Sequence, residues 1–140
     1  VFGPKQSPSG AYAVVIPLFM QALKDEKAPT INGDGEQTRD FTFIENAVQA
    51  NIKAAVAPAK AANEVYNVAF GERISLNELW DELKKISGKE LEANYGPPRA
   101  GDVRDSLADI SKARRLLDYQ PEYSVRDGLR KAWDYFIKHQ

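Results

Sequence analysis

The sequence contains no cysteine and only one histidine, His139, which is the penultimate residue. Without cysteine there is no disulfide framework, no thiol nucleophile and no cysteine-based metal site. One histidine at the end of a chain builds neither a multi-histidine metal site nor a Ser-His-Asp triad. The carboxylates are numerous, but no pair has a spacing that indicates acid–base catalysis. We therefore expect neither a metal site nor catalytic residues in this chain.

Long hydrophobic runs and a strong excess of one charge are also missing. No apolar stretch approaches the roughly 18 residues that span a bilayer, and the first residues show no signal-peptide pattern. The formal net charge is −1, whereas proteins that bind nucleic acid or anionic membranes usually carry a basic excess. We therefore expect a cytoplasmic protein with neither nucleic acid nor membrane as a partner.

What is present is the composition of one ordinary globular domain over residues 1–140, with 43% hydrophobic and 28% charged residues. Apolar periodicity predicts helices over 11–24, 43–57, 76–87 and 111–117, and another from 124 onward. Pro17 either lies in the first turn of its helix or kinks it. Three helix starts are predicted at Thr42, Ser75 and Ser111, the first two as capping boxes. Short strands are predicted near 29–31, 64–69 and 91–95, so the fold class is α/β, mostly helical with few short strands.

The most unusual stretch is polar and glycine-bearing, and it runs from Asn32 to Phe41. Gly33 and Gly35 allow positive φ angles or a close approach to a ligand. The stretch ends in Arg39, whose guanidinium is a rigid fork of donors suited to phosphate. The pattern therefore predicts a tight loop that delivers one arginine to the entrance of a helix. A solvent-exposed turn with a free arginine fits the same letters.

A second glycine- and proline-containing loop, residues 96–102, carries Arg99 and Asp102. Two guanidinium groups that converge would suit a pyrophosphate, which needs charge and several donors together. In the alternative, each arginine pairs with a neighbouring acid at the surface, which contributes roughly 0–1 kcal/mol. Spacing alone leaves both readings open. Neither loop has the G-x-x-x-x-G-K-S/T or G-x-G-x-x-G pattern of known phosphate-binding turns.

A series of short motifs resembles, in the same order, consecutive motifs of one family: Phe2-Gly3-Pro4-Lys5-Gln6, Gly10-Ala11-Tyr12-Ala13, Val15-Ile16-Pro17, Ile31-Asn32-Gly33-Asp34-Gly35, Arg39-Asp40-Phe41, Val65-Tyr66-Asn67-Val68-Ala69, Arg99-Ala100-Gly101-Asp102-Val103-Arg104 and Ser106-Leu107-Ala108-Asp109-Ile110-Ser111-Lys112-Ala113. The family is the extended short-chain dehydrogenase/reductases, the NAD-dependent epimerase/dehydratases of nucleotide sugars. The chain is most similar to its UDP-N-acetylglucosamine/UDP-glucose 4-epimerase branch. The resemblance covers nearly the whole chain and only the C-terminal, substrate-binding part of the family.

The resemblance implies a set of UDP-sugar-binding residues. Arg39 and Arg99 match the family's pyrophosphate arginines, and Asp102 matches the carboxylate that holds a ribose hydroxyl. The remaining positions match segments near the base, the first phosphate and the sugar: Val14, Val15, Phe19, Thr30, Ile31, Asn32 and Phe70. The side chains of Val14, Val15 and Phe19 fit an ordinary core equally well, and Phe70 stands where many members carry a smaller aliphatic residue.

The resemblance also implies what lies outside this chain. The family's N-terminal Rossmann domain, which binds NAD, has no counterpart here, and no tyrosine is followed four residues later by lysine. The parent enzyme would oxidise C4 of the sugar with NAD, rotate the keto sugar and return the hydride to the other face. The 140 residues alone would bind UDP-sugar without turnover. A 4,6-dehydratase or decarboxylase of the same family and a non-catalytic binding module are the alternatives.

The same resemblance places the helix over 43–57 and the strand over 64–69 against the NAD domain. Exposed without that partner, they would present an apolar face and an unpaired edge. We therefore expect self-association or a disordered start, and a homo-oligomer.

Overall fold

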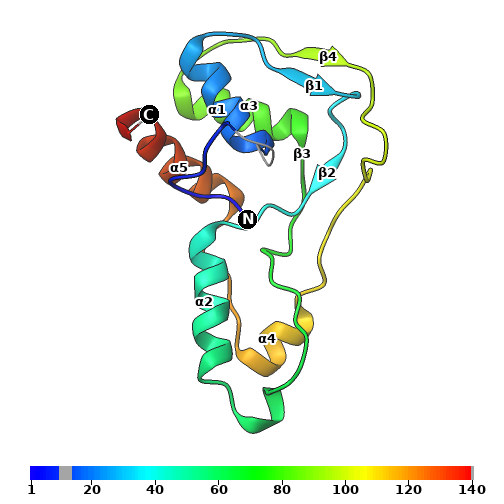
Figure 1. Ribbon diagram of the computed structural model, residues 1–140, viewed down its shortest axis with the longest axis vertical. Helices are drawn as coiled ribbons and strands as arrows, with labels where there is room; N and C mark the ends of the chain where they lie inside the picture. Colours follow the sequence, from blue (N-terminus) through cyan, green and yellow to red (C-terminus); the bar gives the residue numbers. More distant parts are fainter. Residues whose placement is uncertain (10–13, 140) are drawn as a thin grey trace.

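The computed structural model describes residues 1–9 and 14–139. Figure 1 shows a wide upper region, here called the head, and a narrow lower region, here called the stalk. The head contains α1 (Val15–Asp25), β1 (Thr30–Asn32), β2 (Thr38–Arg39), β3 (Ile74–Ser75), α3 (Leu76–Ser87), β4 (Asn94–Gly96) and α5 (Val125–His139). The stalk contains α2 (Ile44–Ala55), the short 3₁₀ helix Ala59–Ala61 and α4 (Ser111–Leu117). The expected fold class, a helix-rich α/β chain with few short strands, is confirmed.

The head is built around α1, α3 and α5, whose apolar faces meet in one core. Phe19 of α1 lies edge-on to Trp80 of α3, with their ring centroids 5.1 Å apart. Trp80 also donates its indole N–H to the Leu91 carbonyl at 3.1 Å, so its polar atom is satisfied. The core of large side chains comprises Phe2, Ile16, Phe19, Met20, Leu23, Ile31, Phe43, Ile74, Leu79, Trp80, Leu83, Leu129, Ala132, Trp133 and Phe136.

The helix starts follow the sequence in part. Ser75 forms the predicted capping box with Glu78, and Gly88 ends α3 with a φ of 68°. Pro17 lies in the first turn of α1, which is the first of the two positions that the sequence allowed, and it does not kink the helix interior. The predicted caps at Thr42 and Ser111 are wrong, because Phe43 and Ile110 precede α2 and α4 and neither helix has a side-chain cap. The part of the predicted first helix over 11–13 lies outside the described residues.

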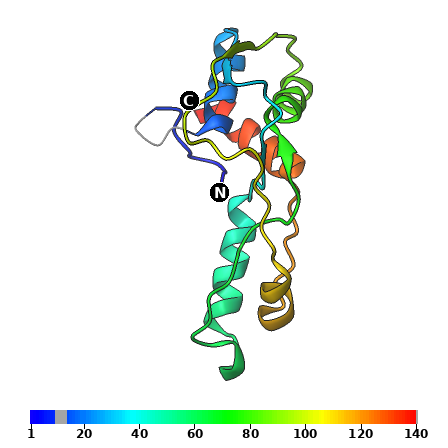
Figure 2. The same cartoon turned by 90° about the vertical axis from the view of Figure 1, so that its right-hand side faces the viewer.

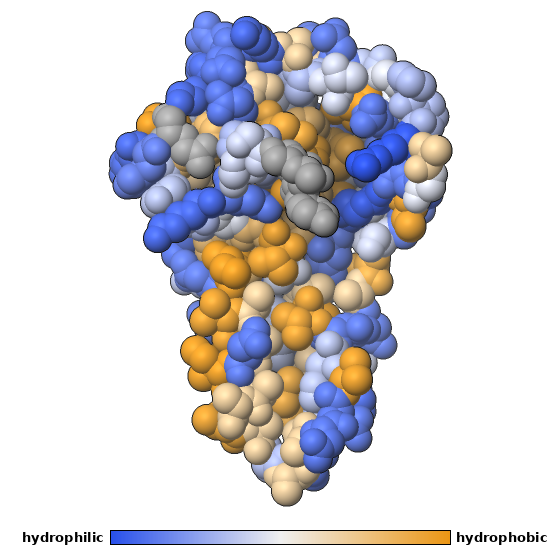
Figure 3. Space-filling model, viewed as in Figure 1, coloured by the Kyte–Doolittle hydropathy of each residue, from blue (hydrophilic) through white to orange (hydrophobic). Residues whose placement is uncertain are grey.

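The stalk has a smaller core made mostly of alanines: Ala50, Ala61, Ala69, Ile110, Ala113, Leu117 and Tyr119. Both views show α2 and α4 side by side in this region (Figures 1 and 2). The buried positions of α2 are Asn46 and Ala50. Its predicted apolar face points to solvent, as expected without a partner, and Figure 3 shows hydrophobic residues along this side of the stalk. The exposed residues form one stripe at helical spacing: Ile44, Val48, Ile52 and Val56.

Two further predictions need correction. Residues 64–69 form no strand, because no described segment pairs with them, and Val65 is 86% exposed. The start of the chain is not loose, because Phe2 is 3% exposed and its N–H and C=O bond Thr42 and Ile44 at 2.9 and 2.8 Å. Its ring also contacts Phe43, 5.5 Å away. The predicted strand near 29–31 is confirmed as β1, and the one near 91–95 as β4, three residues later.

Candidate functional site

Two parallel strands place the starts of two loops side by side; the first loop leads directly into Arg39, and the second contains Arg99. Strand β1 pairs with β4 in a register that sets Ile31 beside Tyr95 and Asn32 beside Gly96. The first loop, residues 33–37 and here called the glycine loop, leaves the carboxyl end of β1. The second, residues 97–104 and here called the arginine loop, leaves the carboxyl end of β4. Ligands of α/β proteins commonly bind outside the carboxyl ends of parallel strands.

The far ends of the two loops are also held together. Thr38 donates its N–H to the Arg104 carbonyl at 2.9 Å and accepts the Ser106 N–H at 3.2 Å. Its hydroxyl donates to the Asp105 carboxylate at 2.7 Å. Gly33, with a φ of 82°, donates its N–H to the Gly96 carbonyl at 3.0 Å near the start of the loops. The loops are therefore fixed to each other at both ends.

An ion pair joins the arginine loop to β2, the strand that directly follows the glycine loop. The Arg39 guanidinium donates to the Asp102 carboxylate, and its other terminal nitrogen donates to the Thr38 carbonyl at 2.7 Å. The side chains of Arg39 and Asp102 keep 26% and 34% of their area exposed, so both can be reached from solvent. The pair excludes the simple alternative in which Arg39 pairs with Asp40. It brings together two of the predicted ligand residues that are far apart in the sequence.

The adjacent acid, Asp40, has a different task. Its carboxylate accepts the backbone N–H of Gly71 at 3.0 Å, that of Phe70 at 3.2 Å and that of Ala108 at 3.4 Å. These bonds connect the residue after β2 to two other segments, one at residues 70–71 and one at residue 108. Asp40 is thus a structural anchor, and it leaves Arg39 free to face the arginine loop.

The arginine loop carries two further cations. Arg99 is exposed, and its carbonyl accepts the Asp102 N–H at 3.1 Å, which places both residues in one turn. Arg104 donates to the Asp34 carboxylate of the glycine loop at 2.7 Å. This hydrogen bond, together with that from the Glu36 N–H, lowers the pKa of Asp34. Three guanidinium groups therefore lie on or beside the paired loops.

The remaining predicted residues divide between surface and core. Thr30, Asn32 and Val14 are exposed, and Val14 has extended backbone just before α1. Val15 is the first helical residue of α1 and packs on the core. The ring of Phe19 is 2% exposed and packs on Trp80, so it lies in the core, and its predicted place near the base stays a prediction. Ile31 is also buried, which leaves its main chain for the predicted contact. Phe70 is half-buried, with its N–H bound to Asp40.

Sequence reasoning missed two side chains that shape the glycine loop. Asn77, in the first turn of α3, bonds the loop at several atoms. Gln37 is 6% exposed and donates to the Asn32 carbonyl at 2.6 Å. The sequence did place Asn77 inside a correctly predicted capping box. Its role could have been suspected only by asking what the start of that helix faces.

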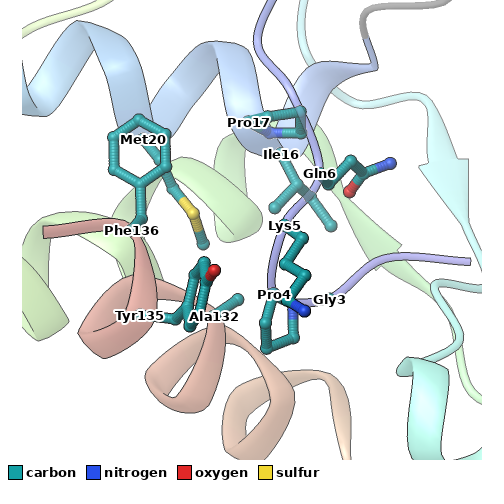
Figure 4. Close-up of a pocket in the computed structure, with 10 residues that line it drawn as sticks. All are labelled: Gly3, Pro4, Lys5, Gln6, Ile16, Pro17, Met20, Ala132, Tyr135 and Phe136. Carbon is teal, nitrogen blue, oxygen red and sulfur yellow. The ribbon is translucent and has the colours of Figure 1, made fainter. Parts of the chain in front are cut away.

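Two hollows in the described part of the chain are lined by residues outside both loops. Figure 4 shows a cavity of about 10 Å³ between the first residues, α1 and α5, room for about one water molecule. Its lining includes Gln6, whose buried Oε1 has no hydrogen-bond partner, beside the apolar Ile16, Met20 and Phe136. A larger, open hollow of about 420 Å³ at the top of the stalk is lined by none of the predicted ligand residues.

Other kinds of site find no support in the described part of the chain. Residues 1–9 and 14–139 contain no group of histidine, cysteine, aspartate or glutamate that could hold a metal ion. None of their helices is long and apolar enough to cross a membrane. His139 stacks on Tyr135, with centroids 4.1 Å apart, at the end of α5.

Comparison with known proteins gives a consistent set of relatives. The family model for GDP-mannose 4,6 dehydratase matches residues 1–132. The UDP-glucose 4-epimerase of Mycolicibacterium smegmatis is 35% identical over 136 residues, which are 97% of this chain and 42% of that protein. The crystal structure of UDP-glucose 4-epimerase with UDP-glucose from Thermotoga maritima has a TM-score of 0.92 and 37% identity, over 98% of this chain and 43% of that one.

A second solved structure adds a different ligand. UDP-glucuronic acid 4-epimerase from Bacillus cereus, in complex with UDP-glucuronic acid and NAD, has a TM-score of 0.89 and 34% identity, over 99% of this chain and 43% of that one. The two solved relatives hold different sugars, but both ligands contain UDP. The chain spans about two fifths of the length of the relatives that it matches.

Proposed function

Since the chain belongs to the GDP-mannose 4,6 dehydratase family, within the extended short-chain dehydrogenase/reductases, we propose that it is the UDP-sugar-binding, C-terminal part of an NAD-dependent nucleotide-sugar 4-epimerase. The observation that carries this proposal is the ion pair between Asp102 of the arginine loop and Arg39, which directly follows the glycine loop; both loops leave the carboxyl ends of paired parallel strands. The 4-epimerase assignment draws on relatives of that activity, of which this chain spans a part.

The cations of the two loops suit a diphosphate. Arg39 uses its two terminal nitrogens for Thr38 and Asp102, and a guanidinium has five donors in all, so donors remain for phosphate oxygens. Arg99 adds a second, exposed guanidinium on the facing loop. Charge-assisted hydrogen bonds to phosphate are about twice as strong as neutral ones. A diphosphate would therefore bind the remaining donors of Arg39, and its negative charge would weaken the pairing of Arg39 with Asp102.

Asp102 and strand β1 supply contacts for the rest of the nucleotide. When phosphate takes its place beside Arg39, the Asp102 carboxylate becomes available to accept a hydrogen bond from a ribose hydroxyl. Thr30 and Asn32 are exposed residues of β1 and would contact the base. The predicted roles of Val14, Val15 and Phe70 remain part of this proposal. The predicted place of Phe19 near the base also remains part of it, with its ring in the core.

The described residues do not fit NAD. A dinucleotide site needs a strand, a glycine-rich turn and a helix in succession. Here the glycine loop after β1 leads into β2, and the described strands form two separate pairs with two or three residues per strand. We therefore place NAD binding and catalysis in a part of the parent enzyme outside these residues. This chain would hold the UDP handle, so that binding energy remote from the reacting carbon positions the sugar.

The stalk fits the same division of labour. The side chains of the stripe Ile44, Val48, Ile52 and Val56 are 39–78% exposed. In a folded monomer, the apolar face of an amphipathic helix normally packs against the core. In the parent enzyme this stripe would be covered by the NAD-binding part. Until it is covered, the chain is expected to self-associate.

Titration of UDP into this chain by isothermal calorimetry tests the proposal. Arg39→Ala and Arg99→Ala should each weaken binding by about 10- to 100-fold, because each removes charged hydrogen bonds that contribute about 1.5–3 kcal/mol. Arg115→Ala is the matched control, an exposed arginine of α4 in the stalk, and should leave binding unchanged. Loss of binding in the control, or equal binding in all variants, would contradict the site.

A dehydratase or decarboxylase of the same family remains the second candidate, and the name of the matching family model favours it. Product analysis of the parent enzyme with UDP-glucose, and with UDP-glucuronic acid for a decarboxylase, which needs a carboxylate to release as CO₂, decides between them. A 4-epimerase yields a sugar of unchanged mass, a 4,6-dehydratase a product lighter by water. If the chain binds UDP but no parent enzyme turns over a UDP-sugar, the third candidate, a non-catalytic binding module, holds.

A further inference from the structure

One side chain outside the predicted site touches nearly every part of the glycine loop. Asn77 donates its backbone N–H to the Gly35 carbonyl at 3.0 Å. Its side-chain amide donates to the Asp34 carbonyl at 3.0 Å and to the Glu36 carboxylate at 2.6 Å. Three consecutive loop residues are therefore bound by one asparagine.

The same side chain reaches the strand that leads into the arginine loop. Asn77 Oδ1 accepts a hydrogen bond from the Tyr95 hydroxyl at 2.9 Å, and Tyr95 lies beside Ile31 in the β1–β4 register. The amide thus links the glycine loop to β4 with donors on one side and an acceptor on the other. Only asparagine or glutamine offers two donors and an acceptor without a charge.

The backbone of α3 strengthens this arrangement. The first N–H groups of a helix lack partners within it, and those of Leu76 and Asn77 are bound by the carbonyls of Gln37 and Gly35 at 3.3 and 3.0 Å. Gly35 is buried with a φ of 78°, and a Cβ there would collide with the Asn77 side chain. The loop is therefore shaped around Asn77 and has little freedom to move away from it.

We propose that Asn77 is a positioning residue for nucleotide binding: it holds the glycine loop in the shape that presents Arg39 to the diphosphate. This inference rests on the proposed function and extends it to a residue that makes no predicted contact with the ligand. Asn77 acts on Arg39 through the chain, because Thr38 and Arg39 directly follow the loop that it fixes.

Asn77→Asp tests the proposal, because it keeps the size of the side chain while removing both side-chain donors. The new carboxylate faces the Asp34 carbonyl and the Glu36 carboxylate, so the loop is repelled where it was bound. An acid in the first turn of a helix favours the helix itself. Thermal unfolding should therefore stay within about 2 °C of the unsubstituted chain, while the Kd for UDP rises about 10-fold or more. Asn51→Asp, on the exposed side of α2, is the matched control and should alter neither quantity.

Rescue separates positioning from general damage. Glu36→Gln added to Asn77→Asp places an amide donor opposite the new carboxylate and should recover about half of the lost affinity, on a logarithmic scale. A Kd for Asn77→Asp within twofold of the unsubstituted chain would overturn the proposal, as would an equal loss in Asn51→Asp.

A measurement without ligand keeps this inference distinct from the proposed function. If the unsubstituted chain does not bind UDP, the proposed site fails, but Asn77 is still judged by hydrogen exchange of the Gly33 and Glu36 amides, both hydrogen-bonded in the loop. Asn77→Asp should speed this exchange about 10-fold. Unchanged exchange would show that Asn77 does not hold the loop.

Discussion

The helices of the head bury most of their large apolar side chains, whereas the main helix of the stalk exposes them. In the head, α1, α3 and α5 turn their large apolar side chains inward, and Leu23, Leu79, Leu83 and Leu129 are fully buried. In the stalk, α2 buries Asn46 and Ala50 and leaves Ile52 and Val56 61% and 78% exposed. Hydrophobic burial contributes roughly 25 cal/mol per Å², so the head holds most of the chain's own stabilisation. The stalk exposes a contiguous apolar face, which is typical of a surface that binds a partner.

The largest expected effect is a truncation in the head core. Leu79→Ala should lower the free energy of unfolding by about 3–4 kcal/mol, because it leaves a cavity among well-packed large neighbours. Leu117→Ala in the stalk is the matched change and should cost about 2 kcal/mol, since an alanine-rich cluster has less to lose. Urea unfolding followed by the fluorescence of Trp80 and Trp133, both in the head, measures the difference. Equal costs would erase the contrast between the two regions.

Next in size is the polar joint between the regions. Asn46 is 1% exposed; it donates to the Tyr123 carbonyl at 2.7 Å and accepts the N–H groups of Glu122 and Tyr123 at 2.9 and 3.1 Å. Asn46→Ala leaves these groups without partners and should cost about 2–3 kcal/mol. Asn51→Ala, on the exposed side of the same helix, should cost under about 1 kcal/mol. Chemical denaturation of both variants checks this, and a similar cost for each would contradict the joint.

A buried tyrosine gives the stalk a pH dependence. Burial, with the nearby Asp40 charge, raises the pKa of Tyr119 to about 12, and its hydroxyl donates to the Ala69 carbonyl at 2.8 Å. From about pH 10 to 12 the unfolded chain loses this proton before the folded one. Stability should therefore fall as pH rises through that range, by up to about 1.4 kcal/mol per unit.

Tyr119→Phe checks that assignment. It should cost about 1 kcal/mol at neutral pH, and it should remove the part of the alkaline loss that belongs to this group. Denaturant midpoints measured at pH 8, 10 and 11 give the slope. An unchanged slope in the variant would assign the alkaline loss to other residues.

The smallest effect on stability is expected at the exposed stripe, where the effect on association is large. Ile52→Lys should change the free energy of unfolding by less than about 0.5 kcal/mol. It should also reduce the concentration dependence that we expect in sedimentation of the unsubstituted chain. Asn51→Lys adds the same charge beside the stripe and should leave association unchanged. A clean monomer at all concentrations would refute self-association through α2.

Sequence patterns predicted what depends on local chemistry. The Ser75–Glu78 capping box and the Gly88 stop define α3 to the residue, because both act through neighbouring backbone groups. The apolar periodicity located α2 correctly. Periodicity predicts that a helix has an apolar face, but it does not predict which surface covers that face. The strand expected over 64–69 failed for the same reason, since a strand requires a partner that the described residues do not supply.

The candidate site was predicted unevenly. Resemblance and composition identified Arg39, Arg99 and Asp102, but the cross-loop ion pair arises from the β1–β4 register, which no local pattern encodes. The sequence left the role of Phe19 open, because an aromatic residue at helical spacing fits a core and a base-binding surface equally well, and its ring lies in the core. Asn77 was missed because its partners lie more than 40 positions earlier in the chain.

The contrast between the regions leads to one direct measurement, hydrogen exchange of the chain with and without saturating UDP. The account predicts slower exchange in residues 33–39 and 97–104 of the head, where the ligand orders the paired loops. It predicts no change in α2 and α4 of the stalk. Protection confined to the stalk, or no protection at the two loops despite measured binding, would contradict the claim that these loops form the nucleotide site.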